Sequence, residues 1–302
     1  MSTDVARIVH FLVTVGEGIG NMVETTPLLH ALGVLGKVWV LAKPTTPGTE
    51  EILRNPTYVE QVWRFDTLPD RMVRPDFDYV VHTYSANTNK DPRFLEEFHD
   101  VGEILQFAEA DAVWARLHGE ALGNLRQVRK IQGWGIEKLQ PRSWVNCRES
   151  DGVYDVVLGS GAYNESKVWP GFDDLKKRIK GEGLTFRDLS EETRLPLPDV
   201  AATIRDAGVF VGNDSGLAHI AAAVRTPAVI LYGPTTIEKN LPYQSTFAIP
   251  LKVDSIDCSP CKYQKSDFER CRLKCWDGLV VDQVLAHTLY TLDNFYTKGG
   301  SR

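Results

Sequence analysis

Residues 209–223 read VFVGNDSGLAHIAAA, and residues 226–235 soon after them read TPAVILYGPT. The first string begins as a buried strand that ends at a glycine, and an alanine-rich run typical of a helix follows it. The second string is another apolar run, closed by a glycine–proline turn. A strand, a glycine turn, a helix and a further strand in this order predict a parallel α/β sheet.

The turn that joins this strand to its helix is suited to bind an anion. The backbone N–H groups of Ser215, Gly216 and Leu217 stand at the helix start, where they lack intrahelical partners and the helix dipole adds positive charge. Ligands of open α/β sheets bind at the carboxyl ends of the strands, where this turn lies. We therefore expect a diphosphate site here. The alternative is that Asp214 and Ser215 only cap the helix.

The rest of the chain repeats this alternation of strands and helices. Its 302 residues suit two domains, and we place their connection in residues 132–146, which are rich in glycine and tryptophan. Residues 280–295 have the pattern of a long amphipathic helix. The expected domains are therefore 1–145 and 146–279, followed by a terminal helix and tail at 280–302. Together with the two strands quoted above, the expected strands are 8–15, 38–42, 59–65, 79–82, 153–158, 209–212 and 228–232.

Composition narrows the class of protein. The chain is 43% apolar and 25% charged, and its formal charge of −6 argues against a general polyanion binder, although a basic groove could still lie on one face. No apolar run approaches the roughly 20 residues that a transmembrane helix needs. The apolar residues 8–15 run into a glycine loop rather than the small-residue cleavage site of a signal peptide, so we do not expect them to be one. We expect a cytoplasmic protein.

The two quoted strings resemble the signature of the ADP-heptose:lipopolysaccharide heptosyltransferases, glycosyltransferase family nine, in which a D-[ST]-G-x-x-H core precedes a helix of small residues. The resemblance implies an α/β protein of the GT-B fold, with two Rossmann-like domains whose parallel sheets face across a cleft. It also implies an acceptor held by the first domain and a nucleotide sugar held by the second. The terminal helix at 280–295 would then pack back on the first domain. The donor site would then include Asp214, Ser215, Gly216, Leu217, His219, Gly233, Pro234 and Thr235. Taken alone, His219 is more often a structural histidine.

A second match to this family lies at the start of the second domain. Gly159, Ser160 and Gly161, followed by Lys167 and a W-P pair, resemble its glycine turn and K-x-W-P element. A lysine there can neutralise the donor's phosphates as the bond to the sugar breaks. The alternative is a solvated surface lysine.

The N-terminal glycine loop reads GEGIGN at residues 16–21. Its G-x-G-x-G spacing is a weak signal, and Lys43 stands where an NAD-binding domain has an acid at the end of the second strand. Residues 20–27 resemble instead the family's G-D-x-x-x-x-T-x-P element. The acceptor-side loop would then include Gly18, Gly20, Asn21 and Glu24.

Asn21 is the main departure from the family. The resemblance implies an aspartate at this catalytic position, proposed as the base that deprotonates the acceptor hydroxyl, and an amide cannot take that proton at neutral pH. Glu17 in the same loop is the nearest replacement, and Glu24 is the second choice. The alternatives are that Glu17 is an exposed loop acid and that the chain has lost activity.

A second departure is a shortening. Between the helix at 173–180 and the strand at 209, family members usually hold an extra strand and helix, with an acid that contacts the nucleoside. This chain offers residues 181–193 and then LPLPD at 195–199. The choice between ADP, UDP and another nucleotide therefore stays open.

Four cysteines form a cluster, Cys258-x-x-Cys261 and, nine residues later, Cys271-x-x-x-Cys275. Such spacing is typical of a structural metal site, and zinc is favoured over iron. Four cysteine ligands leave no open position, so no catalytic metal is expected. The alternative is a set of small buried thiols.

Together these features predict a glycosyltransferase that moves a heptose-like sugar, with inversion, from a nucleoside-diphosphate sugar to an acceptor hydroxyl. The acceptor could be a lipopolysaccharide core sugar, a protein side chain or a modified nucleobase. Two other functions suit the same architecture: a nucleotide-sugar-binding protein without turnover, and a sugar-nucleotide epimerase. An oligomer is compatible with the sequence.

Overall fold

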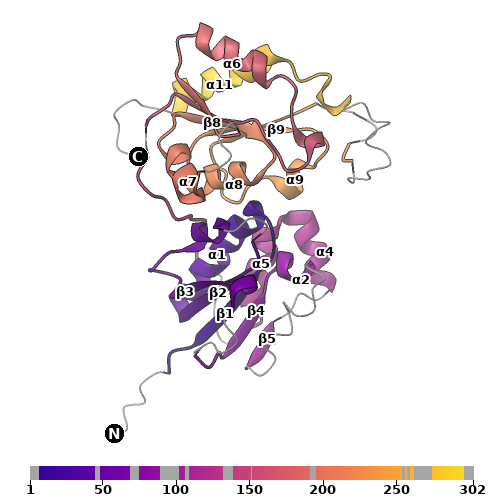
Figure 1. Ribbon diagram of the computed structural model, residues 1–302. Helices are drawn as coiled ribbons and strands as arrows, with labels where there is room; N and C mark the ends of the chain where they lie inside the picture. The colour runs from indigo at the N-terminus through magenta and orange to yellow at the C-terminus, as the bar shows by residue number, and fades with distance from the viewer. Residues whose placement is uncertain are drawn as a thin grey trace. The chain divides into compact units, whose positions relative to one another are not determined.

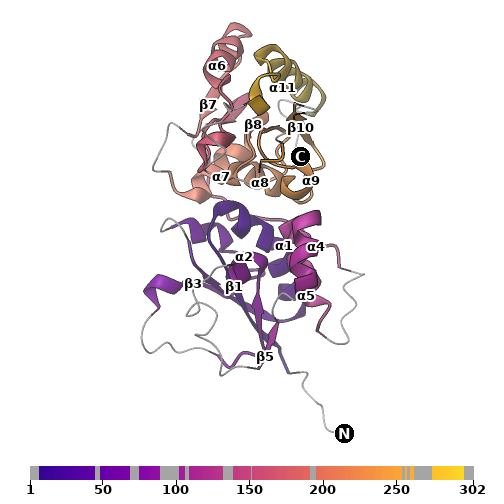
Figure 2. The ribbon, with the colours of Figure 1, turned by 90° about the vertical axis from the view of Figure 1, so that its right-hand side faces the viewer.

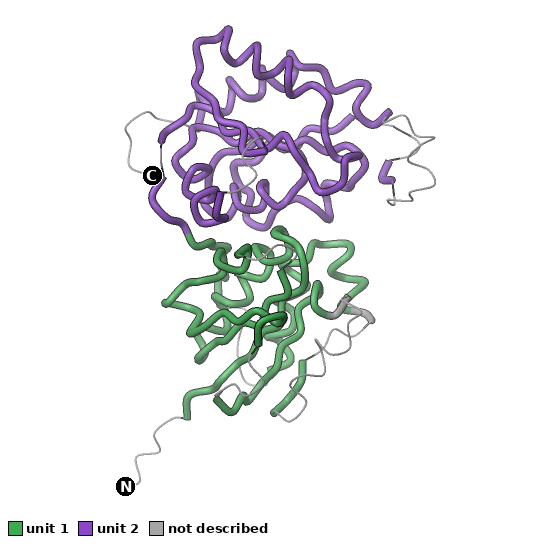
Figure 3. Tube along the Cα trace, viewed as in Figure 1, with its two compact units in different colours: residues 1–146 green, residues 147–302 purple. Residues whose placement is uncertain are grey.

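The computed structural model describes residues 7–44, 48–68, 75–88, 102–105, 109–131, 139–150, 152–190, 195–253, 256, 259–261 and 274–295. The chain divides into two compact units, residues 1–146 and residues 147–302 (Figure 3). Each unit has a parallel sheet and a hydrophobic core of its own. Of the helices in these parts of the chain, none has both the length and the apolar surface that crossing a membrane takes.

The first unit is built on a sheet whose described strands run in the order β3-β2-β1-β4-β5, all parallel (Figure 1). The central strand is almost fully buried, as expected for a parallel sheet covered on both faces. The strands are β1 (His10–Val15), β2 (Lys37–Ala42), β3 (Gln61–Arg64), β4 (Tyr79–His82) and β5 (Glu103–Leu105).

Helix α1 (Ile19–Leu35) directly follows the glycine loop after β1 and packs against α5 (Glu120–Val128). Its Pro27 lies inside the helix, and residues 22–29 are all buried. On β1, the buried Leu12 belongs to a cluster that includes Leu41, Phe77 and Val80. The other helical segments are η1 (Thr49–Leu53), η2 (Phe65–Thr67), α2 (Tyr84–Thr88) and α4 (Glu109–His118).

The second unit has a sheet whose described strands follow the order β10-β9-β8-β6-β7, again all parallel. The expected strand–turn–helix segment forms β8 and α8 (Gly216–Ala223) at the centre of this sheet. The strands are β6 (Val156–Gly159), β7 (Phe186–Asp188), β8 (Val209–Asn213), β9 (Ala228–Tyr232) and β10 (Ala248–Lys252).

Helices cover both faces of this second sheet. Helices α6 (Phe172–Gly181) and α11 (Val281–Phe295) lie side by side on one face, whereas α7 (Leu197–Arg205) and α8 lie on the other (Figures 1 and 2). The short segments are η4 (Glu165–Lys167), α9 (Ile237–Asn240) and η5 (Lys274–Trp276).

Helix α11 differs from the expectation that it packs back on the first domain. Its buried side chains Val284, Leu285 and Leu292 belong to the core of the second unit, together with Trp169 and Trp276. The amphipathic pattern gives a helix and its apolar face, but not the sheet that this face covers.

The interval between α6 and β8 is also more structured than the sequence suggested. It contains the three-residue strand β7 and the helix α7, which starts directly after Pro196. A strand this short carries little periodicity, and the prolines of the LPLPD string favour a loop as much as a helix start.

Candidate functional site

The turn between β8 and α8 presents a helix N-terminus that is not capped by a side chain. Ser215 occupies the N-cap position in an extended conformation and makes no side-chain capping hydrogen bond. Its Oγ is buried and has no hydrogen-bond partner among the described residues. Ser215 therefore does not merely cap α8, and a buried hydroxyl without a partner beside free helix N–H groups suits a polar ligand.

Asp214, the residue before this cap, makes a buried ion pair. Its Oδ2 lies 2.9 Å from the Nζ of Lys167, and the same ammonium donates to the Asp214 carbonyl oxygen at 3.2 Å. The Thr235 hydroxyl donates to Asp214 Oδ2 at 2.6 Å. Lys252 in turn donates to the Thr235 carbonyl oxygen at 2.8 Å. Two lysines therefore lie beside the β8–α8 turn, and Lys167 is not a solvated surface lysine because only 19% of its side chain is exposed.

Asn213, the last residue of β8, connects this turn to the glycine turn after β6. Its side chain is fully buried, and its Oδ1 accepts a hydrogen bond from the Trp169 backbone N–H at 3.0 Å. Its Nδ2 donates to the Ser160 carbonyl oxygen at 2.8 Å. One signal in the sequence could have indicated this role, a polar residue at the end of a fully apolar strand.

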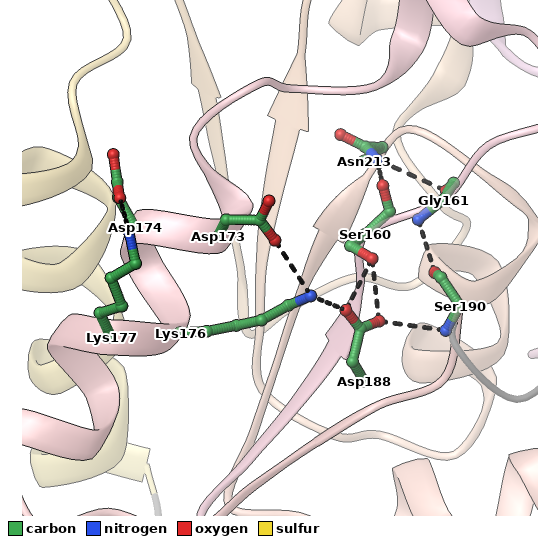
Figure 4. A network of polar contacts seen from close by, with 9 residues as sticks. All are labelled: Ser160, Gly161, Asp173, Asp174, Lys176, Lys177, Asp188, Ser190 and Asn213. Atoms are coloured by element: carbon green, nitrogen blue, oxygen red, sulfur yellow. Dashed lines mark hydrogen bonds and ion pairs between the residues drawn. The ribbon is translucent and has the colours of Figure 1, made fainter.

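The glycine turn at residues 159–161 is held from its other side by the end of β7 (Figure 4). The Ser160 hydroxyl lies 2.9 and 2.8 Å from the two carboxylate oxygens of Asp188. The Gly161 N–H donates to the Ser190 hydroxyl at 2.5 Å, and the Ser190 N–H donates to Asp188 at 3.0 Å. Lys176 from α6 completes the network with an ion pair to Asp188 at 2.7 Å.

His219 lies buried in the first turn of α8. Burial lowers the pKa of its imidazole to about 4; Asp214 opposes this shift and Lys167 adds to it. The side chain is therefore neutral at pH 7. A neutral imidazole adds no charge to the site, but it can donate or accept a hydrogen bond.

The turn after β9 is fixed by close packing. A side chain at Gly233 would place its Cβ 2.3 Å from the Trp276 ring, and the Trp276 indole N–H donates to the Ser166 carbonyl oxygen at 3.1 Å. The Pro234 carbonyl oxygen accepts a hydrogen bond of 2.7 Å from the Cys261 N–H. The turn at 233–235 therefore packs against Trp276 of η5 and contacts the cysteine region through Cys261.

The structure brings the expected donor residues of the second unit to one edge of its sheet. Gly159 ends β6 and Ser160 follows it, Asp214 to His219 follow β8, and Gly233 to Thr235 follow β9. These are the carboxyl ends of three neighbouring strands, where ligands of open α/β sheets bind. Sequence reasoning missed Asn213, Lys176, Asp188, Ser190 and Lys252.

Two of the four cysteines can be placed. Cys275 is buried in the core of the second unit, and Cys261 is half-buried beside Pro234. Cys258 and Cys271 lie outside the described residues. Within the described part of the chain no group of three or more His, Cys, Asp or Glu side chains is placed to hold a metal. The metal site therefore stays a prediction.

In the first unit, the glycine loop starts α1 without a side-chain cap. Gly18 has φ +97°, a conformation that a residue with a side chain rarely adopts, and Gly20 lies in the first turn of the helix. The Asn21 amide donates to the Glu17 carbonyl oxygen, which closes the loop. The Glu17 side chain is exposed, whereas Glu24 is buried on α1 with 8% exposure.

Part of the chain is similar in sequence to known heptosyltransferases. The model of glycosyltransferase family 9 (heptosyltransferase) matches residues 185–272. A lipooligosaccharide heptosyltransferase 2 of Campylobacter jejuni is 21% identical over 141 residues, 47% of this chain and 42% of that protein. A lipopolysaccharide heptosyltransferase 3 of Escherichia coli is 38% identical over 84 residues, 27% of this chain and 22% of that protein. Each match spans less than half of the relative's own length.

The fold is similar along nearly the whole chain. The structure of the Escherichia coli heptosyltransferase WaaC with ADP has a TM-score of 0.66 at 15% identity, and covers 94% of this chain and 100% of that one. The two Rossmann-like units thus have the fold of GT-B glycosyltransferases, as the sequence predicted. The resemblance to glycosyltransferase family 9 is confirmed as well, because the family match spans the segment from Asp214 to Thr235.

Proposed function

We propose that the second unit binds a nucleoside-diphosphate sugar at the carboxyl ends of β6, β8 and β9, and that the protein is a glycosyltransferase. The observation that carries the proposal is the buried Lys167–Asp214 pair at the uncapped N-terminus of α8. The helix supplies N–H donors and partial positive charge, and the Lys167 ammonium, whose charge is balanced by Asp214, supplies a further N–H donor beside them. This combination suits a diphosphate.

The same groups can assist the chemistry. When the bond between the anomeric carbon and the diphosphate oxygen breaks, the oxygen keeps the electron pair and negative charge grows on the leaving group. Lys167 and the N–H groups of Ser215 and Gly216 stabilise this charge where it develops. Asp214 keeps the ammonium in place through its 2.9 Å contact.

The acceptor hydroxyl then attacks the anomeric carbon from the side opposite the diphosphate, which inverts its configuration. The hydroxyl must lose its proton to a base, and Glu17 is the candidate because it lies in the loop after β1 and its backbone contacts Asn21, which stands at the family's base position. Glu24 is less suited because its side chain is buried on α1. Asn21 keeps a structural role through its bond to the Glu17 carbonyl oxygen.

For the donor, we propose an ADP-sugar. For the acceptor, we propose no single class. The Escherichia coli WaaC structure of similar fold is described with ADP, and the sequence relatives are named heptosyltransferases, which supports ADP-heptose as the first donor to test. A glycan, a protein side chain and a modified nucleobase are the acceptor classes to compare. The net charge of −6 favours the first two, because a nucleic-acid acceptor calls for a basic face.

Turnover of nucleotide sugars tests this proposal. The purified chain is incubated with ADP-heptose, and then with UDP- and GDP-sugars, while free nucleoside diphosphate and sugar products are followed by mass spectrometry. A glycosyltransferase releases the nucleoside diphosphate, slowly with water and faster with its acceptor. Binding without release in any acceptor mixture would indicate the non-catalytic alternative. Conversion of the donor to an isomer of equal mass without acceptor would indicate an epimerase.

We also propose a structural metal at the four cysteines, on their spacing and on the position of Cys261. The Cys261 N–H bonds to Pro234, so an ordered cysteine segment would support the 233–235 turn of the donor site. Zinc is the first candidate and iron the second. Elemental analysis of the purified chain should find close to one equivalent of metal. A metal content far below one equivalent in the wild-type protein would contradict the proposed metal site.

A further inference from the structure

A second buried polar network, apart from the Lys167–Asp214 pair, is centred on Asp188. This aspartate ends β7, the second strand of the β6–α6–β7 segment. In dinucleotide-binding Rossmann domains an acid at the end of the second strand accepts hydrogen bonds from ribose hydroxyls. By its place in the fold, Asp188 is therefore a candidate to contact the nucleoside.

Its environment excludes direct contact. Only 1% of the Asp188 side chain is exposed. Its carboxylate accepts from the Ser160 hydroxyl, the Ser190 N–H and the Lys176 ammonium, which occupy three of about four acceptor positions on a carboxylate. Asp188 therefore binds protein groups rather than a ligand (Figure 4).

Those groups fix the glycine turn in place. Ser190, held by Asp188 through its N–H, accepts a hydrogen bond from the Gly161 N–H at 2.5 Å. From the opposite side, Asn213 donates to the Ser160 carbonyl oxygen at 2.8 Å. The turn is thus set before any ligand arrives, and a preorganised loop binds more tightly because less conformational freedom is lost on binding.

The first unit contains the same arrangement. The Gly16 N–H donates to the Ser85 hydroxyl at 3.1 Å, and the Ser85 N–H donates to the carboxylate of Glu120 at 3.2 Å. Glu120 is buried as well, with 7% exposure. In both units a buried acid holds a serine, and the serine holds the glycine turn after the first strand of that unit.

We infer that Asp188 is a positioning residue of the donor site, which sets the glycine turn through Ser190 and Ser160 and raises donor affinity without touching the donor. Lys176 neutralises the buried carboxylate in this network, since an unpaired buried charge is costly. The inference rests on the proposed function, because it takes the glycine turn to be part of a nucleotide-sugar site.

Calorimetric titration of the full chain with ADP, and with UDP and GDP in parallel, tests the inference. The variants are Asp188→Asn, Ser190→Ala and the double variant, each titrated well below its melting temperature. We expect each single change to weaken binding by about tenfold, the loss that one hydrogen bond to a charged group accounts for. The double variant should bind about as weakly as Asp188→Asn alone, because both changes break one relay.

Lys177→Met is the matched control. Lys177 neighbours Lys176 on α6 but pairs with Asp174 at 2.7 Å on the surface, where both side chains are more than two-thirds exposed. Its loss should leave the affinity unchanged.

A merely structural role for Asp188 would lower the melting temperature and leave the dissociation constant of the folded variants as in wild type, and this result would overturn the inference. Additive losses in the double variant would overturn it too. If Asp188→Asn does not fold, the dissociation constant of Ser190→Ala still tests the inference: a value equal to that of the wild type would overturn it. If the wild-type chain binds none of the nucleotides, the proposed function fails instead.

Discussion

Lys167 is the residue on which the donor site most depends. Replacing it with alanine removes the positive charge beside α8 and leaves Asp214 without its ion-pair partner. We expect nucleoside-diphosphate affinity to fall by about 10- to 100-fold, the range for a hydrogen bond to a charged group. Titration calorimetry checks this, with Lys239→Met, an exposed lysine on α9, as the control. Equal loss in both variants would point to general electrostatics rather than to a site.

Glu17 is the residue proposed to take the proton from the acceptor hydroxyl. The Glu17→Gln variant keeps the size of the side chain and removes the base, so turnover should fall by about 10²- to 10⁴-fold. Donor affinity should stay unchanged, because Glu17 is not one of the residues proposed to hold the diphosphate. Initial rates and donor titration on the same preparation separate the two effects. Full turnover by the variant would remove Glu17 from the mechanism.

His219 links stability to pH. Its pKa is near 4 in the folded chain and near 6.5 when unfolded, so between these values the unfolded chain binds a proton that the native chain does not. Stability therefore falls as pH drops from 6.5 towards 4, by up to about 1.4 kcal/mol per pH unit from this group.

Urea unfolding of wild type and His219→Gln at pH 7 and pH 5 measures this contribution. The variant should lose less stability than wild type over the interval, since it has no imidazole to protonate at this position. Equal losses would show that the imidazole is not held neutral by burial.

The residues whose roles the sequence predicted best are those in contiguous motifs. Asp214 and Ser215 could be located because a strand, a turn and a helix follow one another within fifteen residues. Asp188 could not, because its partners Ser160 and Lys176 come from other elements and only the folded sheet brings them together. The same is true of Lys252, which reaches Thr235 from a neighbouring strand.

At the scale of elements, the turn after β9 offers a direct test of close packing. In Gly233→Ala the new Cβ would overlap the buried Trp276 ring, at 2.3 Å, so the turn or the ring must shift. We expect a loss of about 1–3 kcal/mol in the free energy of unfolding, as for other overpacked cores. Urea denaturation measures it.

Gly181→Ala is the control for this change. Gly181 ends α6, and no heavy atom lies within 4 Å of a Cβ placed there. Alanine at that position should leave stability unchanged or raise it slightly, because it restricts the unfolded chain. A similar loss in both variants would mean that the contact with Trp276 is not the cause.

Elements with a long or fully apolar pattern were predictable from the sequence. The expected strands at 38–42 and 228–232 and the helix at 280–295 match β2, β9 and α11 to within one residue at each end. Among the elements that were missed, β7 is a three-residue strand, and α7 is a helix whose N-cap residue and second residue are both prolines. Pairing with β6 stabilises β7, and its own residues carry little signal.

At the scale of the whole molecule, the second unit has a sheet and a hydrophobic core of its own. The described residues of 147–302 form a parallel sheet, and α11 contributes to the core on it. We expect a fragment of these residues to unfold in one cooperative transition on heating. Circular dichroism as a function of temperature measures this transition. A broad transition without a folded baseline would show that this fragment does not fold stably without the first unit.

The expectation that α11 packs on the first domain came from the family resemblance, and nothing in the helix itself specified its partner. An apolar stripe such as Val284, Leu285 and Leu292 can cover any sheet of suitable shape. Fold class was therefore predictable from periodicity and motifs, whereas the packing partner of a terminal helix was not.

If the proposed donor site is correct, the β8–α8 turn and its neighbours bind a nucleoside diphosphate. A melting-temperature screen of the full chain with ADP, UDP, GDP and their sugar conjugates tests it most directly. A ligand at 100 times its dissociation constant should stabilise the native state by about 2.7 kcal/mol, and the Lys167→Ala variant should lose most of that shift. If no nucleoside diphosphate or nucleotide sugar raises the melting temperature of the wild-type chain, the account of this site is contradicted.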